Sequence, residues 1–176
     1  MPLYLIRGLV ALAWAAGFAA VSDSLTAGTG AFLVVYPGID LVASLVDARR
    51  QTGPARSLLR FDAGVSAVAA VGLAIAATGN VADVLVVWGA WATVTGVAQV
   101  VVALQRRAVL GNQWPMLVAG GLSTLVGFFY VGQALGDDPK LSVLSVYAAG
   151  GGAFFVIQSA LLVRRERRAA AAAQVA

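Results

Sequence analysis

Cysteine and histidine are both absent from this chain, and charged residues are scarce. Without cysteine there is no disulfide and no thiol nucleophile, and without histidine the commonest metal ligand and general base is missing. The sequence has no glycine-rich phosphate loop, nucleophile elbow or metal-ligand spacing. We therefore predict a protein that is not an enzyme, with no catalytic residues, no metal site and no cofactor.

Long apolar stretches occupy most of the chain. Of the 176 residues, 60% are hydrophobic and only 11% are charged, whereas about 25% charged residues are usual in a soluble domain. Six apolar segments of about 20 residues are each long enough to cross a hydrocarbon core of about 30 Å. They cover residues 3–21, 25–48, 58–78, 84–104, 114–135 and 141–163. The sequence predicts an all-α polytopic membrane protein, with the lipid bilayer as its partner.

The basic residues lie mainly at one set of helix ends. If the N-terminus is cytoplasmic, all 12 Lys and Arg residues except Lys140 fall at or near cytoplasmic ends, which is the positive-inside pattern. This pattern, and a composition rich in Arg, Ala, Gly and Val, predict a bacterial cytoplasmic membrane protein with both termini inside. Basic residues spread over helix ends without a fold motif argue against nucleic-acid binding. A cleaved signal peptide is disfavoured because Arg7 lies within the first apolar segment.

An internal repeat is visible in the helix endings. The strings "DARR" at 47–50, "LQRR" at 104–107 and "LVRR" at 162–165 recur at a spacing of about 57 residues. They predict three helical hairpins covering about residues 3–50, 58–107 and 114–165. Since each hairpin enters and leaves on the cytoplasmic side, the repeats are parallel. We expect a single transmembrane domain over residues 1–168, followed by a disordered Ala-rich cytoplasmic tail at 169–176.

Glycines recur with helical spacing in the second half of the chain. Gly89 and Gly96 are seven residues apart, and Gly120 and Gly127 repeat this spacing. Such stripes let two helix backbones approach closely within a membrane. The alternative is that they are incidental glycines in a Gly-rich composition.

Three segments carry a resemblance to a known family. These are "IRGLVALAWAAGFAA" at 6–20, "WGAWATVTGVAQVVVALQRR" at 88–107 and "GNQWPMLVAGGLSTLVGFF" at 111–129. The chain resembles the HdeD family of bacterial acid-resistance membrane proteins. The resemblance implies six helices in two-helix repeats and a role in envelope or acid stress. Its second helix departs from the family pattern, because it carries Tyr36-Pro37-Gly38 and places the acid at Asp40.

Asp40 is the most deeply placed acid in the predicted membrane region. It lies nine residues before Arg49, or roughly 13 Å along a helix. An ionised carboxylate at that depth costs about 2.5–3.5 kcal/mol unless it faces the protein interior. Tyr36 shares its helix face, and Pro37 is expected to bend the helix there. The predicted intramembrane polar site therefore comprises Asp40, Tyr36, Gln99 and Gln158.

The remaining charged residues are predicted to form ion pairs or to mark the membrane topology. Arg7 is expected to snorkel toward the cytoplasm and to form an ion pair with Asp47 or Asp62. A group of arginines near the C-terminus is either a topology signal or a contact for anionic lipid. This group consists of Arg164, Arg165, Arg167 and Arg168. Association with itself or with other membrane proteins stays open.

Two functions follow from these features. The first is a non-enzymatic integral membrane protein acting in envelope or acid-stress tolerance, as the resemblance implies. The alternative is a small proton-sensitive transporter or channel that uses Asp40. An intramembrane enzyme is least favoured, because it needs paired catalytic groups and only one acid lies that deep.

Overall fold

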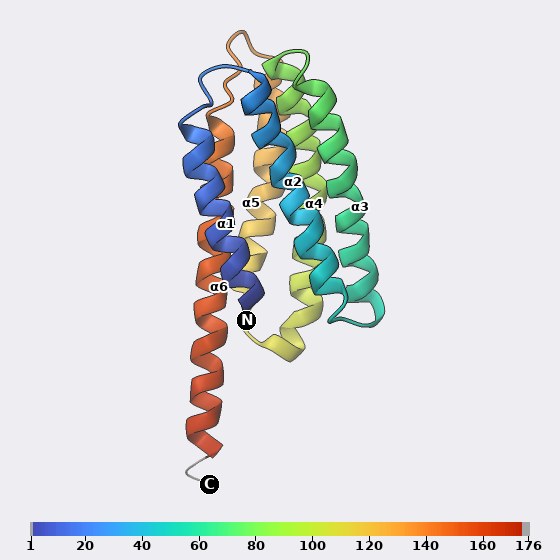
Figure 1. Cartoon of the computed structure of the whole chain (residues 1–176). Helices are drawn as coiled ribbons and strands as arrows, with labels where there is room; N and C mark the ends of the chain where they lie inside the picture. Colours follow the sequence, from blue (N-terminus) through green and yellow to red (C-terminus); the bar gives the residue numbers. More distant parts are fainter. Residues whose placement is uncertain (1, 174–176) are drawn as a thin grey trace.

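The structure, a computed structural model, describes residues 2–173 as an all-helical bundle (Figure 1). The helices are α1 (Pro2–Ala19), α2 (Ala27–Ala48), α3 (Gly53–Ala76), α4 (Val81–Leu110), α5 (Trp114–Ala134) and α6 (Val143–Ala173). No strand occurs within these residues. The predicted fold class is confirmed.

Several helices extend beyond the apolar segments that predict them. Helix α3 begins at Gly53 because Pro54 suits the first turn of a helix. Helix α4 begins after Asn80, whose side-chain oxygen accepts a hydrogen bond from the Asp83 backbone N–H at 2.9 Å. Helix α6 continues through residues 169–173, where a disordered tail is expected. Alanine has the highest helix propensity, so the Ala run favours helix; residues 174–176 lie outside the described residues.

The helices have the length and surface of membrane spans. Helices α2 to α6 are each long and apolar enough to cross a membrane, and α1 is a shorter apolar helix. With 18 residues, α1 extends about 27 Å. Large apolar side chains cover the outer faces, as at Val68 and Ile75 on α3 and Phe128 on α5, which are 74%, 68% and 65% exposed. The chain is an integral membrane protein.

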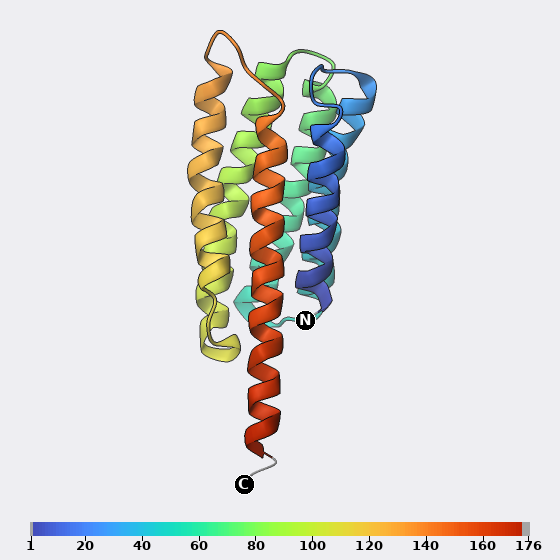
Figure 2. The same ribbon diagram turned by 90° about the vertical axis from the view of Figure 1, so that its left-hand side faces the viewer.

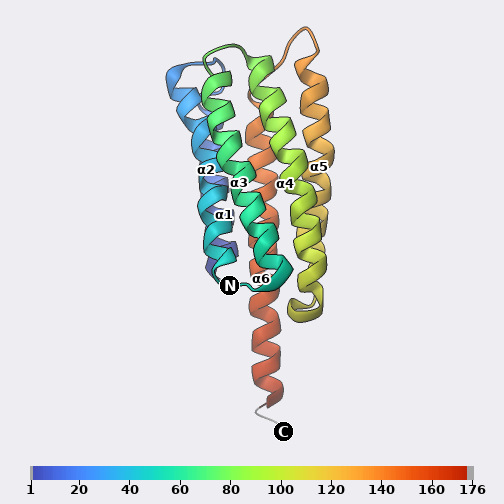
Figure 3. The same ribbon diagram turned by 90° about the vertical axis from the view of Figure 1, so that its right-hand side faces the viewer.

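The helices alternate in direction around a ring. Figures 1 and 2 show α1 and α6, the first and last helices, side by side. The connections at 20–26, 77–80 and 135–142 lie at one end of the bundle, and those at 49–52 and 111–113 lie at the other (Figure 3). The start of α1 also lies at the second end, and α6 projects beyond it. The last part of α6 carries four exposed arginines, Arg164, Arg165, Arg167 and Arg168. The arginine-rich helix ends are therefore collected at one end of the bundle.

Glycines form the closest helix contacts. A Cβ atom built on Gly96 would lie 2.7 Å from the Gly120 carbonyl oxygen, and one on Gly89 would lie 2.6 Å from that of Gly127. The predicted glycine contact is confirmed, and it joins α4 to α5. Gly8 makes a similar contact with Gly152 and joins α1 to α6. Helix α2 packs closely on α3, so the closest helix pairs join different predicted hairpins, with α1 and α6 joining the first hairpin to the last.

An aromatic core fills the bundle toward the end opposite the arginines. Trp88 is fully buried, and its ring centroid lies 5.6 Å from that of Trp14 and 5.3 Å from that of Tyr36. Trp91 is also buried. Trp114, at the start of α5, is 44% exposed, as expected for an aromatic residue at a membrane interface.

Candidate functional site

A cavity of about 280 Å³ lies at the centre of the bundle and is lined by residues from all six helices. Most of its wall is apolar or aromatic. Its charged and amide side chains are Arg7, Asp40, Asp47, Asp62, Gln99, Arg106 and Gln113. An apolar pocket with a few convergent polar groups is the usual form of a binding site in proteins.

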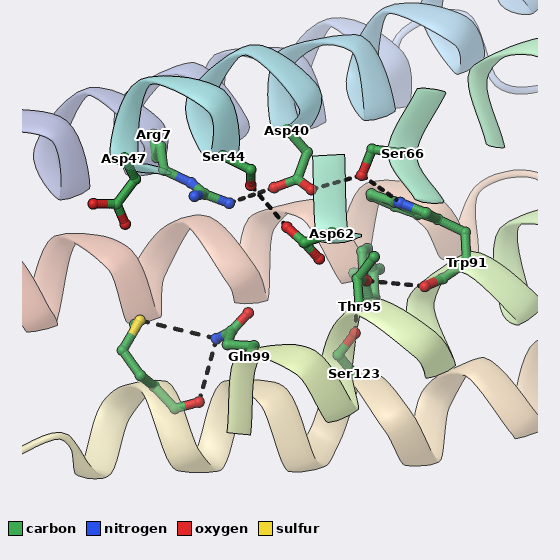
Figure 4. Close-up of polar contacts among 12 residues, drawn as sticks. Arg7, Asp40, Ser44, Asp47, Asp62, Ser66, Trp91, Thr95, Gln99 and Ser123 are labelled. Carbon is green, nitrogen blue, oxygen red and sulfur yellow. Dashed lines mark hydrogen bonds and ion pairs between the residues drawn. The ribbon is translucent and has the colours of Figure 1, made fainter. Parts of the chain in front are cut away.

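One chain of polar contacts crosses four helices beside this cavity (Figure 4). Arg7 Nη2 on α1 forms an ion pair with Asp40 Oδ1 on α2. The other carboxylate oxygen of Asp40 accepts a hydrogen bond from Ser66 Oγ on α3 at 2.8 Å. Ser66 Oγ in turn accepts one from Trp91 Nε1 on α4 at 3.0 Å. Both oxygens of Asp40 are thus occupied as acceptors.

The pairing of Arg7 differs from the prediction. The expectation that Arg7 pairs with Asp47 or Asp62 is wrong, because its ion-pair partner is Asp40. Snorkelling describes a side chain that faces lipid, whereas the Arg7 side chain lines the cavity and is 15% exposed. Its guanidinium carbon also lies 4.6 Å from the centroid of the Phe155 ring, a favourable cation–π distance.

A second ion pair lies nearer the arginine-rich end. Arg106 Nη1 on α4 is 2.9 Å from Asp47 Oδ2 on α2, and it donates a hydrogen bond to the Tyr4 hydroxyl at 3.0 Å. Arg106 is only 7% exposed. In the sequence, Arg106 has the pattern of a topology signal, and its role in the cavity wall is not predicted. The available signal is its position seven residues after Gln99, which places both on one helix face.

Asp62 on α3 is the third carboxylate of the cavity wall. It accepts a hydrogen bond from Ser44 Oγ at 2.7 Å and lies beside the Arg7–Asp40 pair (Figure 4). Within residues 2–173 it has no Lys or Arg nitrogen at ion-pair distance. The cavity wall therefore holds three carboxylates and two guanidinium groups.

The other predicted site residues are divided between the cavity and the helix contacts. Tyr36 lines the cavity and continues the aromatic core. Gln99 also lines it, and its Nε2 donates to the Met116 carbonyl oxygen at 3.2 Å. Gln158 is fully buried outside the cavity wall, and its Nε2 lies 3.4 Å from the Asn112 carbonyl oxygen. The structure brings Asp40, Tyr36 and Gln99 together, and Gln158 joins α6 to the α4–α5 connection.

The fold and the cavity define a class: a polytopic helical membrane protein with a charged, partly apolar cavity inside its bundle. In the described part of the chain, no group of three or more acidic side chains is arranged to hold a metal ion. Comparison with protein-family models, curated proteins and solved structures finds no match to this chain.

Proposed function

We propose that the protein is a non-enzymatic membrane protein of the bacterial cytoplasmic membrane that binds and releases a proton at the central charged cluster. The observation that carries the proposal is the imbalance of three carboxylates against two guanidinium groups on one cavity wall. Asp40 and Asp47 each have an arginine partner, whereas Asp62 has the Ser44 hydroxyl. Asp62 is therefore the proton-binding group.

The size of the electrostatic effects supports a proton on Asp62. Two unit charges 4 Å apart interact by about 4 kcal/mol at an effective dielectric constant of 20. An ionised carboxylate deep in a membrane costs about 2.5–3.5 kcal/mol. One arginine can thus offset the cost of one carboxylate. Because Arg7 is engaged by Asp40, a neighbouring ionised Asp62 gains little from it, and a bound proton removes the remaining charge.

The charge distribution of the bundle supports a cytoplasmic source for this proton. By the positive-inside rule, the arginine-rich end lies in the cytoplasm. The cavity extends toward that end, since Tyr4, Arg106 and Gln113 line it. Exposed arginines in the last part of α6 favour contact with anionic lipid headgroups there. A role in acid or envelope stress, as the HdeD resemblance implies, accords with a site that senses cytoplasmic acidification.

A small transporter or channel is the second candidate, and the cavity itself favours it. A volume of about 280 Å³ beside ionisable groups is large enough for several water molecules or a small solute. The buried rings of Trp14 and Trp88 lie between this cavity and the opposite end. Transport therefore requires these rings to move, whereas proton binding does not.

Infrared difference spectroscopy on the full chain in lipid nanodiscs tests proton binding. We expect a protonated carboxyl band near neutral pH that is lost in Asp62→Asn and retained in Asp83→Asn, whose carboxylate is exposed in the first turn of α4. A band that persists in Asp62→Asn assigns the proton elsewhere and contradicts the proposal.

A pH-sensitive dye inside proteoliposomes distinguishes proton binding from transport. Proton flux after an acid jump that is abolished by Asp62→Asn favours transport. No flux from either the unaltered protein or the variant favours proton binding alone.

A further inference from the structure

The cavity wall carries one more acidic group than basic groups. Its two arginines are paired with two of its carboxylates, and Asp62 has no basic partner among residues 2–173. With all five groups ionised, three negative and two positive charges leave a net charge of −1. Unbalanced charge inside a membrane is costly. A monovalent cation balances this wall as well as a proton on Asp62 does, whereas an anion adds to the imbalance.

Asp62 has one carboxylate oxygen that is free to contact a ligand. Its Oδ2 atom accepts a hydrogen bond from Ser44 Oγ at 2.7 Å, whereas Oδ1 receives none within residues 2–173. Oδ1 is not one of the unpaired polar atoms that are sealed inside the packed protein. Figure 4 shows one oxygen of Asp62 directed toward Ser44 and the other pointing away from it. Since Asp62 belongs to the cavity wall, this second oxygen is accessible from the cavity.

Three aromatic rings from different helices meet at the cavity wall. Tyr36 on α2, Trp91 on α4 and Tyr147 on α6 all line it, and their ring centroids lie 5.8 to 6.5 Å apart. Trp91 donates a hydrogen bond to Ser66, which lies four residues after Asp62 on the same face of α3. The rings are therefore on the same side of the cavity as this carboxylate. Aromatic faces attract weakly hydrated cations, above all quaternary ammonium groups.

The cavity reaches the outer surface of the bundle between α5 and α6. Leu122 on α5 and Val146 on α6 belong to its wall, and they are also 46% and 72% exposed. Gly150, one turn after Val146, lines the cavity too and has no side chain to narrow the opening. Helix α5 packs less closely on α6 than on α4. Because this surface faces lipid, a ligand with an apolar part can enter the cavity from the bilayer.

We propose that the cavity binds a monovalent lipophilic cation of the quaternary ammonium type, with its charged group between Asp62 and the rings of Tyr36, Trp91 and Tyr147. Inorganic cations require several oxygen ligands, which an aromatic wall does not supply. The organic cation and the proton neutralise the same carboxylate, so each excludes the other. This competition rests on the proposed proton site at Asp62, whereas the cation site rests on the charge balance, the aromatic wall and the opening to lipid.

The effect of pH on this site depends on every ionisable group of the cavity. Besides Asp62, these groups are Tyr4 and Arg7 on α1, Tyr36, Asp40 and Asp47 on α2, Arg106 on α4 and Tyr147 on α6. Arginine stays charged at all accessible pH values, and tyrosine ordinarily ionises only near pH 10. Asp40 and Asp47 each keep an arginine partner. Protonation of Asp62 removes the negative charge that attracts the cation, so affinity for a permanently charged cation should fall as the pH is lowered.

Binding of radiolabelled phenyltrimethylammonium to the full chain in nanodiscs tests the cation site, with empty nanodiscs as the blank. This probe carries a permanent charge, and tert-butylbenzene is its neutral isostere. We expect saturable binding of the probe. Unlabelled probe should displace it at least about tenfold more effectively than tert-butylbenzene or benzenesulfonate; tenfold corresponds to about 1.4 kcal/mol. Absence of saturable binding overturns the proposal, and so does equally effective displacement by the neutral or the anionic compound.

Variants locate the bound cation. Asp62→Asn should weaken binding of the probe at least about tenfold, whereas Asp83→Asn, exposed in the first turn of α4, should leave it unchanged. Ala119 lines the cavity on α5, so Ala119→Phe should fill part of the space and also weaken binding at least about tenfold. Circular dichroism checks the fold of each variant. Unchanged affinity in Asp62→Asn or in Ala119→Phe overturns the proposal.

Calorimetry in two buffers of different protonation enthalpy tests the competition with the proton. We expect proton release when the probe binds near neutral pH, and an affinity that falls with pH by up to about tenfold per pH unit. Binding without proton release and without pH dependence overturns the competition. The infrared band reads Asp62 without any ligand. A band with no probe binding contradicts the cation site alone, and probe binding that requires Asp62 without a band contradicts the proton site alone.

Discussion

Ser66 Oγ lies 2.8 Å from Asp40 Oδ2 and donates its proton to it. Ser66 Oγ also accepts a hydrogen bond from Trp91 Nε1, because an indole nitrogen is only a donor, and its own O–H proton is left for Asp40. Asp40 is therefore held as an acceptor at both oxygens, one toward Ser66 and one toward Arg7. This arrangement suits an ionised Asp40.

Removing the Ser66 hydroxyl is expected to destabilise the bundle. In Ser66→Ala, the buried Trp91 N–H loses its acceptor and Asp40 loses a donor, which costs about 1–3 kcal/mol in free energy of unfolding. Ser57→Ala, at an exposed position on the same helix, is the matched control. Thermal unfolding in detergent, followed by circular dichroism, should give a lower midpoint for Ser66→Ala than for Ser57→Ala. Equal midpoints contradict this prediction.

Two ion pairs, Asp47 with Arg106 and Asp138 with Lys140, lie at opposite ends of the bundle. Removal of the carboxylate should lower the free energy of unfolding by different amounts in the two pairs. Asp47→Ala leaves the buried Arg106 guanidinium uncompensated and should lower the free energy of unfolding by about 3–5 kcal/mol. Asp138→Ala breaks a pair with Lys140 whose side chains are 79% and 63% exposed, and the expected cost is below about 1 kcal/mol. A double variant, Asp47→Leu with Arg106→Met, should recover most of the loss. Chemical unfolding of the three variants measures the difference, and a larger loss for Asp138→Ala rules the account out.

Glycine replacements should distinguish the α4–α5 contact from open positions. A Cβ atom at Gly96 would lie 2.7 Å from both the Gly120 carbonyl oxygen and the Thr124 backbone nitrogen, so Gly96→Ala must push the two helices apart. Gly121 has no neighbour within 4 Å of such an atom. Gly121→Ala should therefore stabilise the helix by roughly 0.5–1 kcal/mol. Melting temperatures that move in opposite directions are expected, and a rise for Gly96→Ala would show that the contact tolerates separation.

Membrane orientation can be tested by introducing single cysteines, because the chain has none. We expect Gln51→Cys, in the connection between α2 and α3, to react with an impermeant maleimide only from the cytoplasmic side. Asp137→Cys, in the connection between α5 and α6, should react only from the outside. Labelling of intact spheroplasts and of inverted vesicles gives the two measurements. Reaction of Asp137→Cys in inverted vesicles alone would reverse the proposed orientation.

The sequence predicts the helices and part of the site because those features depend on local patterns. Apolar length identifies the spans, and the seven-residue glycine spacing identifies the surfaces that join α4 and α5. The depth and helix face of Asp40 place it toward the bundle interior beside Tyr36. These inferences require no knowledge of which helices are neighbours.

The partners within the site depend on helix neighbours, and the sequence does not determine them. Arg7 meets Asp40 because α1 and α2 present these residues to a shared cavity, whereas side-chain direction on a single helix favoured an outward position. Arg106 resembles the arginines at other helix ends until the structure places Asp47 beside it. Gln158 has a depth comparable to that of Gln99, yet its helix presents it to the α4–α5 connection.

The contact of α1 with α6 through Gly8 and Gly152 affects how the protein is made. During translation, α1 enters the membrane long before the ribosome has synthesised α6. The nascent chain must therefore hold an incomplete bundle, with the glycine face of α1 open to lipid or to an insertion chaperone. Chains that stop before residue 143 never acquire this closing helix, and we expect membrane proteases to remove them quickly.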